Sequence, residues 1–313
     1  MSASIMLVAL LADIVTGWPR GLFAAIGHPV TWLGHLVGVL DARLNSPASP
    51  PVTRRVLGIV TLMVVTAAAA APAALVQWAL QDVQLGWICI GLFAWPLVAA
   101  RSLNEHVTAV LAPLQRSDLG SARNGGAMIV GRDVTRLDEA GVARAAIESL
   151  SENASDGIVA PIFWGMLLGL PGIAAYKAVN TLDSMIGHKS DRHADFGWAS
   201  ARLDDLVNLV PARLTGLLIA IVSGVPGRAL ATMTRDATRH RSPNAGYPEA
   251  AMAGALGVRL SGPRIYHDRI ADEPWLNGAA RDPDAGTLAR ALGIYQRTLL
   301  LLAVLLAGLA WLA

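Results

Sequence analysis

Long apolar runs separated by polar segments dominate the pattern of this chain. Nearly uncharged stretches cover residues 2–17, 22–40, 56–81, 84–100, 158–176, 214–227 and 298–313. A membrane-spanning helix needs about 20 mostly apolar residues, so the run 56–81 is the surest span. The runs at the two chain ends and at 22–40 are short for a span, and 214–227 is long enough only if 206–213 join it. The pattern predicts an all-α, polytopic integral membrane protein.

The run 158–176 has a break near its middle, where Gly169-Leu170-Pro171-Gly172 interrupts the apolar residues. If this run simply crossed the bilayer, the polar residues 148–156 and 180–184 would face opposite compartments. Broken helices are tolerated where they line a cavity or are buried in protein. We therefore predict a broken or re-entrant helix around 158–176. A kinked span is the alternative, because Gly and Pro are also common in ordinary transmembrane helices.

Composition and charge agree with a membrane protein. Of the 313 residues, 54% are hydrophobic and only 15% are charged, whereas about a quarter of the residues in a soluble domain are charged. The net charge of +2 is small, and no basic block with interleaved aromatic residues occurs. We therefore expect a lipid bilayer around the chain and no nucleic-acid binding.

Arginines concentrate in two polar segments, 101–157 and 228–297. The positive-inside tendency places such segments in the cytoplasm, although the tendency weakens for long loops. We therefore expect a single membrane-embedded domain over 1–313, a multi-pass arrangement, cytoplasmic polar segments and an active site that faces the cytoplasm.

The first polar cluster occupies residues 148–156 and is rich in oxygen ligands. Read as a helix, one face would carry Glu148, Ser149, Glu152, Asn153 and Asp156. A solvated surface helix would show the same spacing. The cluster runs directly into the apolar residues 157–164, however, and ionisable groups at a membrane boundary are usually functional. We therefore favour an active-site wall, and magnesium prefers such oxygen ligands.

Two further clusters lie at 177–184 and 202–208. In the first, one helical stripe would carry Lys177, Asn180, Asp183 and Ser184. A helix cap would explain Asn180 or Asp183 but not Lys177. In the second, one face would carry Arg202, Asp205 and Asn208, and an intrahelical salt-bridge set is an almost equal alternative.

Familiar catalytic motifs are absent from the sequence. The chain contains no Gly-x-x-x-x-Gly-Lys-Ser/Thr phosphate loop, no helix-opening Gly-x-Gly-x-x-Gly, no His-Glu-x-x-His and no Gly-x-Ser-x-Gly elbow. Carboxylates that act with a metal remain the best expectation. Arg132, in the turn Gly131-Arg132-Asp133, can hold an anion as a bidentate donor, although a lone exposed pair is equally consistent with this turn.

Four long motifs carry a resemblance to a known family. They are Arg144-Ala-Ala-Ile-Glu-Ser-Leu-Ser-Glu-Asn-Ala-Ser-Asp-Gly157, Tyr176-Lys-Ala-Val-Asn-Thr-Leu-Asp-Ser-Met185, Ala201-Arg-Leu-Asp-Asp-Leu-Val-Asn208 and Ser242-Pro-Asn-Ala-Gly-Tyr-Pro-Glu-Ala-Ala-Met252. Shorter motifs in the N-terminal half, such as Trp18-Pro19 and His28-Pro29-Val30, also fit. Together they resemble the adenosylcobinamide-phosphate synthase family of cobalamin biosynthesis, over nearly the whole chain.

The resemblance implies an acid–amine ligase in a bacterial inner membrane. Such an enzyme joins adenosylcobyric acid to (R)-1-aminopropan-2-ol or its O-phosphate at the expense of ATP with Mg²⁺, which gives adenosylcobinamide or its phosphate. The expected partners are these substrates and the lipid bilayer. A homo-oligomer and an association with other late corrinoid-pathway membrane enzymes both remain open.

The residues suit this chemistry in kind. A carboxylate does not form an amide in water unless it is activated, and activation by phosphoryl transfer needs a metal and cations around phosphate oxygens. We expect catalytic roles for Lys177, Asp183, Arg202 and Glu148. We expect ATP binding and substrate orientation by Arg132, Arg213, Asn153, Asn180, Asn208 and Ser184. We expect Mg²⁺ to be held by Glu152, Asp156 and Asp205.

Two alternatives to a ligase have support in the sequence. A Mg²⁺-dependent membrane prenyltransferase also clamps a diphosphate with Asn and Asp clusters, but its repeated Asn/Asp-x-x-x-Asp pattern is matched only in part by residues 204–208. A transporter with a broken-helix substrate site would show an inverted repeat, and the apolar halves of this chain differ in number.

Overall fold

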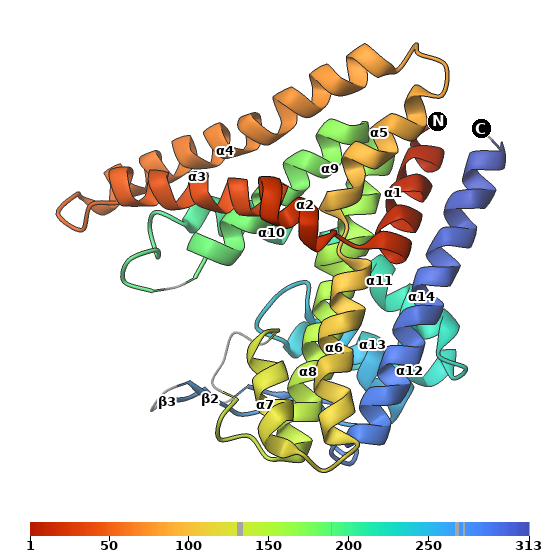
Figure 1. The fold of residues 1–313 in the computed structure, drawn as a ribbon. Helices are drawn as coiled ribbons and strands as arrows, with labels where there is room; N and C mark the ends of the chain where they lie inside the picture. The colour runs from red at the N-terminus through yellow and green to blue at the C-terminus, as the bar shows by residue number, and fades with distance from the viewer. Residues whose placement is uncertain (130–133, 189, 267–268, 272, 313) are drawn as a thin grey trace. The chain divides into compact units, whose positions relative to one another are not determined.

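The computed structural model describes residues 1–129, 134–188, 190–266, 269–271 and 273–312, and nearly all of its regular structure is helical (Figure 1). The chain forms two compact units. Unit 1 contains Met1–Ala99, Ala160–Asn208 and Leu305–Ala313, and unit 2 contains Ala100–Val159 and Leu209–Val304. Both units contain apolar helices. The single domain expected over 1–313 stays a prediction.

Unit 1 consists of helices and the turns that join them. They are α1 (Ser2–Thr16), α2 (Arg20–Ile26), α3 (Pro29–Leu44), α4 (Pro51–Leu80), α5 (Gly86–Ala94), the short η1 (Trp95–Leu97), α9 (Ala160–Ile186) and α10 (Trp198–Val207). Helix α3 has a strong start, because His28 Nδ1 accepts the backbone N–H of Val30 at 3.2 Å and Pro29 occupies the first helical position.

Unit 2 combines helices with two small antiparallel strand pairs. Its helices are α6 (Ala100–Leu114), α7 (Leu119–Ala127), α8 (Glu139–Ala154), η2 (Ser155–Val159), α11 (Leu209–Val222), α12 (Pro226–Asp236), η3 (Ala237–Arg239), α13 (Gly246–Leu256) and most of α14 (Ala285–Leu312). Strand β1 (Leu260–Ser261) pairs with β4 (Trp275–Leu276), and β2 (Arg264–Tyr266) pairs with β3 (Arg269–Ala271). Aspartates start several helices: Asp138 accepts the N–H of Gly141, and Asp284 accepts that of Thr287, each at 2.7 Å.

The apolar helices confirm the predicted polytopic, all-α class. Within the described residues, five helical stretches are long and apolar enough to cross a bilayer, and the α10–α11 pair, bent by 44°, would make a sixth. The five are Arg20–Leu44, Pro51–Leu80, Gly86–Leu114, Glu139–Ile186 and Ala285–Leu312. Helix α1 has only 15 residues, fewer than a span requires. Helix α14 starts at Ala285, whereas the apolar run begins only near 298. The first turns of the helix contain arginines and therefore do not belong to the apolar run.

Helix α9 is broken as predicted. Gly169 has φ 69° and ψ −152°, a conformation essentially restricted to glycine. A Cβ on Gly172 would overlap the carbonyl oxygen of Trp164, although eight residues of straight helix would separate the two by about 12 Å. The chain therefore folds back on itself at Gly169. This reversal confirms the predicted broken helix and excludes a merely kinked span.

A side chain from α4 satisfies the backbone at this break. The N–H of Leu170 donates to Oε1 of Gln77 at 2.7 Å, which supplies an acceptor that a continuous helix would otherwise provide. Trp164, before the break, donates its indole N–H to the carbonyl of Val207 at 3.0 Å. Both contacts fix the hairpin inside unit 1, as expected for non-helical backbone in a membrane environment.

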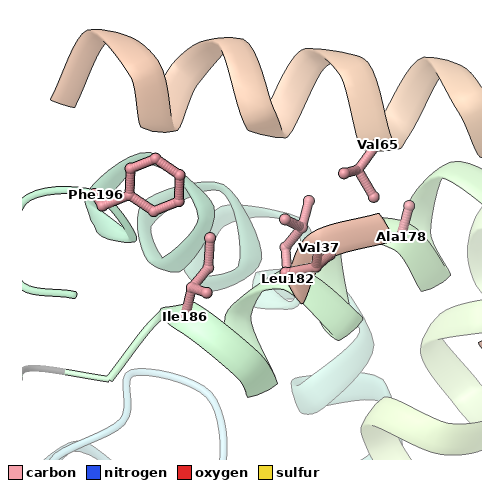
Figure 2. Close-up of a cluster of buried hydrophobic side chains, with 6 residues drawn as sticks. All are labelled: Val37, Val65, Ala178, Leu182, Ile186 and Phe196. Carbon is pink, nitrogen blue, oxygen red and sulfur yellow. The ribbon is translucent and has the colours of Figure 1, made fainter. Parts of the chain in front are cut away.

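A compact core holds the second half of α9. Figure 2 shows its buried side chains gathered between α3, α4, α9 and the loop that follows α9; they are Val37, Val65, Ala178, Leu182, Ile186 and Phe196. Gly58 of α4 lies directly against the backbone of Phe196, where a Cβ would overlap the carbonyl oxygen. An ion pair also connects this loop to α3, since Arg192 pairs with Asp41 at 2.6 Å.

Candidate functional site

The first group of candidate residues lies on α9 and α10 in unit 1. The buried face of α9 packs into the core of Figure 2 through Ala178 and Leu182. Lys177, Asn180 and Asp183 are half-buried on the same helix. The predicted stripe therefore lies on one helix, and the opposite face of that helix packs into the hydrophobic core. Such packing is the support that a catalytic site requires.

A buried hydrogen-bond network joins α10 to α9. The hydroxyl of Tyr176 donates to Oδ1 of Asn208 at 2.9 Å, and Nδ2 of Asn208 donates to Oδ2 of Asp204 at 3.0 Å. The predicted residue Asn208 is thus oriented by two partners. No role was predicted from the sequence for Tyr176 or Asp204. The sequence signals that could have found them are the apolar flank of Tyr176 and the i, i+4 spacing of Asp204 and Asn208.

Three carboxylates of this group, those of Asp183, Asp204 and Asp205, influence one another electrostatically. Asp204 is 9% exposed, and its Oδ1 accepts no hydrogen bond from the described residues. The charges of Asp183 and Asp205 act on it, and the amide of Asn180 approaches the same carboxylate. Mutually repelling carboxylates with an unsatisfied buried oxygen are unfavourable alone. A cation bound beside them would relieve both costs.

The three remaining predicted residues of the second and third clusters have different surroundings. Arg202 is 68% exposed at its side chain and pairs with Asp205 at 3.9 Å, which is the intrahelical pair weighed as the alternative. Ser184 is exposed and donates its hydroxyl to the carbonyl of Asn180 at 2.9 Å. The charge of Lys177 acts on His28 at the start of α3. His28 is therefore a neighbour of the candidate site that the spacing pattern did not reveal.

The second group lies on α8 in unit 2, where the helix carries the predicted polar face as far as Asn153 and leaves Asp156 outside it. Glu148 is only 5% exposed, and its Oε1 accepts the N–H of Ser261 at 2.7 Å, whereas Glu152 and Asn153 are exposed. Helix α8 ends at Ala154, and Asp156 lies half-buried in a π-helical turn. A π-helical turn shifts the register, so positions beyond it leave the α-helical face.

The hydrogen bonds of this group favour a structural role for Glu148 and its neighbours, namely holding α8 in place. The bond to Ser261 joins α8 to β1, and Ser261 has the uncommon positive φ of 59°. Nδ2 of Asn153 donates to the carbonyl of Ser149 at 2.9 Å, and Oγ of Ser149 donates to the carbonyl of Ile129 at 2.7 Å. The catalytic role of Glu148 stays a prediction.

Arg213 on α11 is held by α13. Its Nη2 donates to the Tyr247 hydroxyl at 3.0 Å, its guanidinium carbon lies 3.9 Å from the centre of the Tyr247 ring, and Nη1 donates to the carbonyl of Leu209 at 2.6 Å. Tyr247 is a contact that sequence reasoning did not assign, since the two residues are far apart in the chain. Arg132 lies outside the described residues, and its predicted role stays a prediction.

A preformed metal site requires several ligand side chains close together. Over the part of the chain that the structure describes, no group of three or more His, Cys, Asp or Glu side chains is arranged to hold an ion. Mg²⁺ commonly binds through one or two carboxylates plus substrate phosphates. The roles predicted for Glu152, Asp156 and Asp205 therefore stay predictions, and the unsatisfied oxygen of Asp204 adds a candidate ligand.

Fold and side chains together define the class: a polytopic, all-α membrane protein that carries acidic, amide and basic groups on its helices. The chain matches the family described as CobD/Cbib protein over residues 6–295. The protein belongs to this family, which confirms the resemblance seen in its motifs.

Similar proteins cover almost the whole chain. The cobalamin biosynthesis protein CobD of Rhodobacter capsulatus is 57% identical over 297 residues, which are 95% of this chain and 94% of that protein. The proteins of the same name from Rhizobium meliloti and Brucella suis are 48% and 44% identical, covering 90% and 95% of this chain and 89% and 94% of their own lengths. No solved structure matches the chain.

Proposed function

We propose that this protein is an ATP-dependent ligase of cobalamin biosynthesis. It would form an amide bond between adenosylcobyric acid and (R)-1-aminopropan-2-ol or its O-phosphate, which gives adenosylcobinamide or its phosphate. Membership in the CobD/Cbib family supports the pathway, because the relatives are named cobalamin biosynthesis proteins. The polar group on α9 and α10 within apolar surroundings is the observation that carries an enzymatic role.

The proposed reaction has two steps. An oxygen of the corrinoid carboxylate attacks the γ-phosphorus of ATP, which forms an acyl phosphate and releases ADP. The amine nitrogen then attacks the acyl carbon, the bond to the phosphate oxygen breaks, and amide, phosphate and one proton are released. The first step is favoured by positive charge around the phosphate oxygens.

The residues on α9 and α10 suit the binding of a phosphate-bound cation. Asp183 and Asp205 supply carboxylates, Asp204 supplies a buried oxygen without a hydrogen bond, and Asn180 lies beside them. Mg²⁺ bound here would neutralise charge on the phosphate groups of ATP. Tyr176 and Asn208 would hold Asp204 in place through their two hydrogen bonds.

Basic residues would bind the phosphate oxygens and the substrate acid. Lys177 lies on the same stripe as Asn180, about one turn away, and is proposed as a catalytic cation. Arg202 is exposed and within one turn of Asp205, so it can turn toward a ligand. Arg213 would bind phosphate oxygens. In unit 2, Glu152 and Asp156 are proposed as Mg²⁺ ligands, and Glu148 as the residue that fixes α8.

The site is proposed to face the cytoplasm from a bacterial inner membrane, where ATP is available. The corrinoid acid and the amine would reach it from the same side. A homo-oligomer, or contact with other membrane enzymes that act late on corrinoids, would be compatible with the exposed apolar helices.

Purified full-length protein in detergent tests the proposal directly. ATP consumption is expected only when adenosylcobyric acid and the amine are both supplied, with one ADP released for each amide formed. Mass spectrometry of the corrinoid product identifies the amide, and parallel reactions with the free amine and its O-phosphate identify the preferred substrate. Turnover of an isoprenoid diphosphate, or vesicle flux without ATP-linked chemistry, would replace the ligase by one of its alternatives.

A further inference from the structure

Arg213 differs from Arg235 and Arg259 of unit 2 in how its charge is compensated. Asp282 pairs with Arg259 at 2.6 Å, and Asp236 pairs with Arg235 at 2.7 Å. Among the residues that the structure describes, no carboxylate pairs with Arg213. Its guanidinium is half-buried and is held instead by an aromatic ring, a hydroxyl and a backbone carbonyl.

These contacts leave part of the guanidinium available to a ligand. Arginine has five N–H donors, and two are used in the bonds to Leu209 and Tyr247. The Tyr247 ring covers one face at 3.9 Å. The remaining three donors have the fork geometry that suits two oxygens of a phosphate group.

The Tyr247 ring is itself held in place. Helix α11 approaches α13 closely, because a Cβ on Gly216 would lie only 3.1 Å from the carbonyl oxygen of Tyr247. Pro248 and Glu249, which follow Tyr247, are both buried. Arg213 therefore rests on a ring whose backbone cannot shift without disturbing the packing of the two helices.

We infer that Tyr247 is a positioning residue that sets the direction of Arg213 toward a phosphate group, so that Arg213 and Tyr247 together form a phosphate-binding unit. This inference rests on the proposed function for the identity of the phosphate, namely that of ATP. The ring fixes the plane of the guanidinium, and the hydroxyl fixes its rotation. A ligand would then bind without the cost of ordering a long side chain.

Two substitutions separate the contributions of the ring and the hydroxyl. Tyr247→Phe keeps the ring and removes the hydrogen bond, and we expect the Kd for MgATP and for inorganic pyrophosphate to rise about tenfold. Tyr247→Leu removes both contacts, and we expect a rise of about a hundredfold. The matched control is Tyr295→Phe, which removes a buried hydroxyl that donates to the carbonyl of Ala100 at 2.7 Å in the same unit.

The experiment uses titration calorimetry on the purified full-length protein, together with the KM for each substrate and the thermal midpoint. The inference predicts a higher KM for ATP, an unchanged KM for the amine, and a loss of thermal stability no larger than that of Tyr295→Phe. A purely structural role would lower the thermal midpoint and leave the Kd for both phosphate ligands within twofold, which would overturn the inference. Wild-type protein that binds neither MgATP nor pyrophosphate would overturn it as well.

The two proposals fail in different ways. If pyrophosphate binding weakens in the expected order but no amide is formed by the wild-type protein, the ligase falls and the phosphate-binding unit stands. If amide forms and the variants keep the wild-type KM for ATP, the ligase stands and Tyr247 has no positioning role.

Discussion

Replacing Gly169 by alanine tests the hairpin that divides α9. The glycine has φ 69° and ψ −152°, and holding a residue with a Cβ in such a region costs about 1–3 kcal/mol. The added Cβ would also overlap Oε1 of Gln77 and lie 2.8 Å from its Cδ. Gln77 would have to move, and the buried N–H of Leu170 would lose its acceptor, at a cost of about 1–3 kcal/mol.

We therefore expect Gly169→Ala to destabilise the protein by about 2–6 kcal/mol, the sum of these two ranges. That is a large part of a typical stability of about 5–15 kcal/mol. Thermal unfolding in detergent, followed by tryptophan fluorescence, measures the loss. Gly38→Ala in α3 is the matched control, because its Cβ would meet nothing within 4 Å, and we expect a gain of about 0.5–1 kcal/mol.

A double variant separates backbone strain from overlap. Gln77→Ala alone removes the acceptor of Leu170, and the combination with Gly169→Ala removes the overlap as well. We expect the double variant to be more stable than the sum of the single losses implies, because both single changes break the same hydrogen bond. Strict additivity, or a Gly169→Ala protein as stable as wild type, would refute the hairpin geometry described here.

Three further predictions concern the site and the start of α14. Asp183→Asn should abolish amide formation and leave membrane insertion intact, so normal turnover would remove Asp183 from the site. The second prediction uses a chain in which the exposed Cys89 is replaced by serine. Single cysteines introduced at the exposed positions Glu152 and Ser184 should react with an impermeant thiol reagent only from the cytoplasmic side. Labelling of the two positions from opposite sides would exclude a shared site. Hydrogen bonds from Thr287, then from Arg281, lower the pKa of Asp284 from 3.8 to about 2. Stability from this cap is present above about pH 4 and is lost as the pH falls toward 2, and Asp284→Asn should remove that part of an acid-unfolding profile.

Much of the fold was predictable, because lipid imposes a simple rule on sequence. The apolar run 56–81 became α4 with a shift of a few residues, and the Gly-Leu-Pro-Gly segment at 169–172 became the predicted reversal. The stripe from Lys177 to Asp183 lies on one helix as predicted, because α-helical spacing fixes which residues share a face. These features depend on neighbours within one or two turns.

The predicted face of α8 ends before Asp156, because local spacing could not reveal a π-helical turn. Nothing in the spacing of Glu148, Glu152 and Asp156 distinguishes a regular helix from one with an extra residue in its last turn. The burial of Glu148 depends on Ser261, more than a hundred residues later. Arg213 was predicted to bind phosphate, which remains a prediction, and the ring that holds its guanidinium was not predicted.

The sequence by itself determined the membrane class, the family, the broken helix and the three polar clusters, because hydrophobic length and helical period are local properties of a chain. The tertiary structure decided which carboxylates meet, which one is left with an unsatisfied oxygen, and which ring holds Arg213. Such contacts join helices that are distant in sequence, and they are set by how packed side chains exclude one another, which no local pattern encodes.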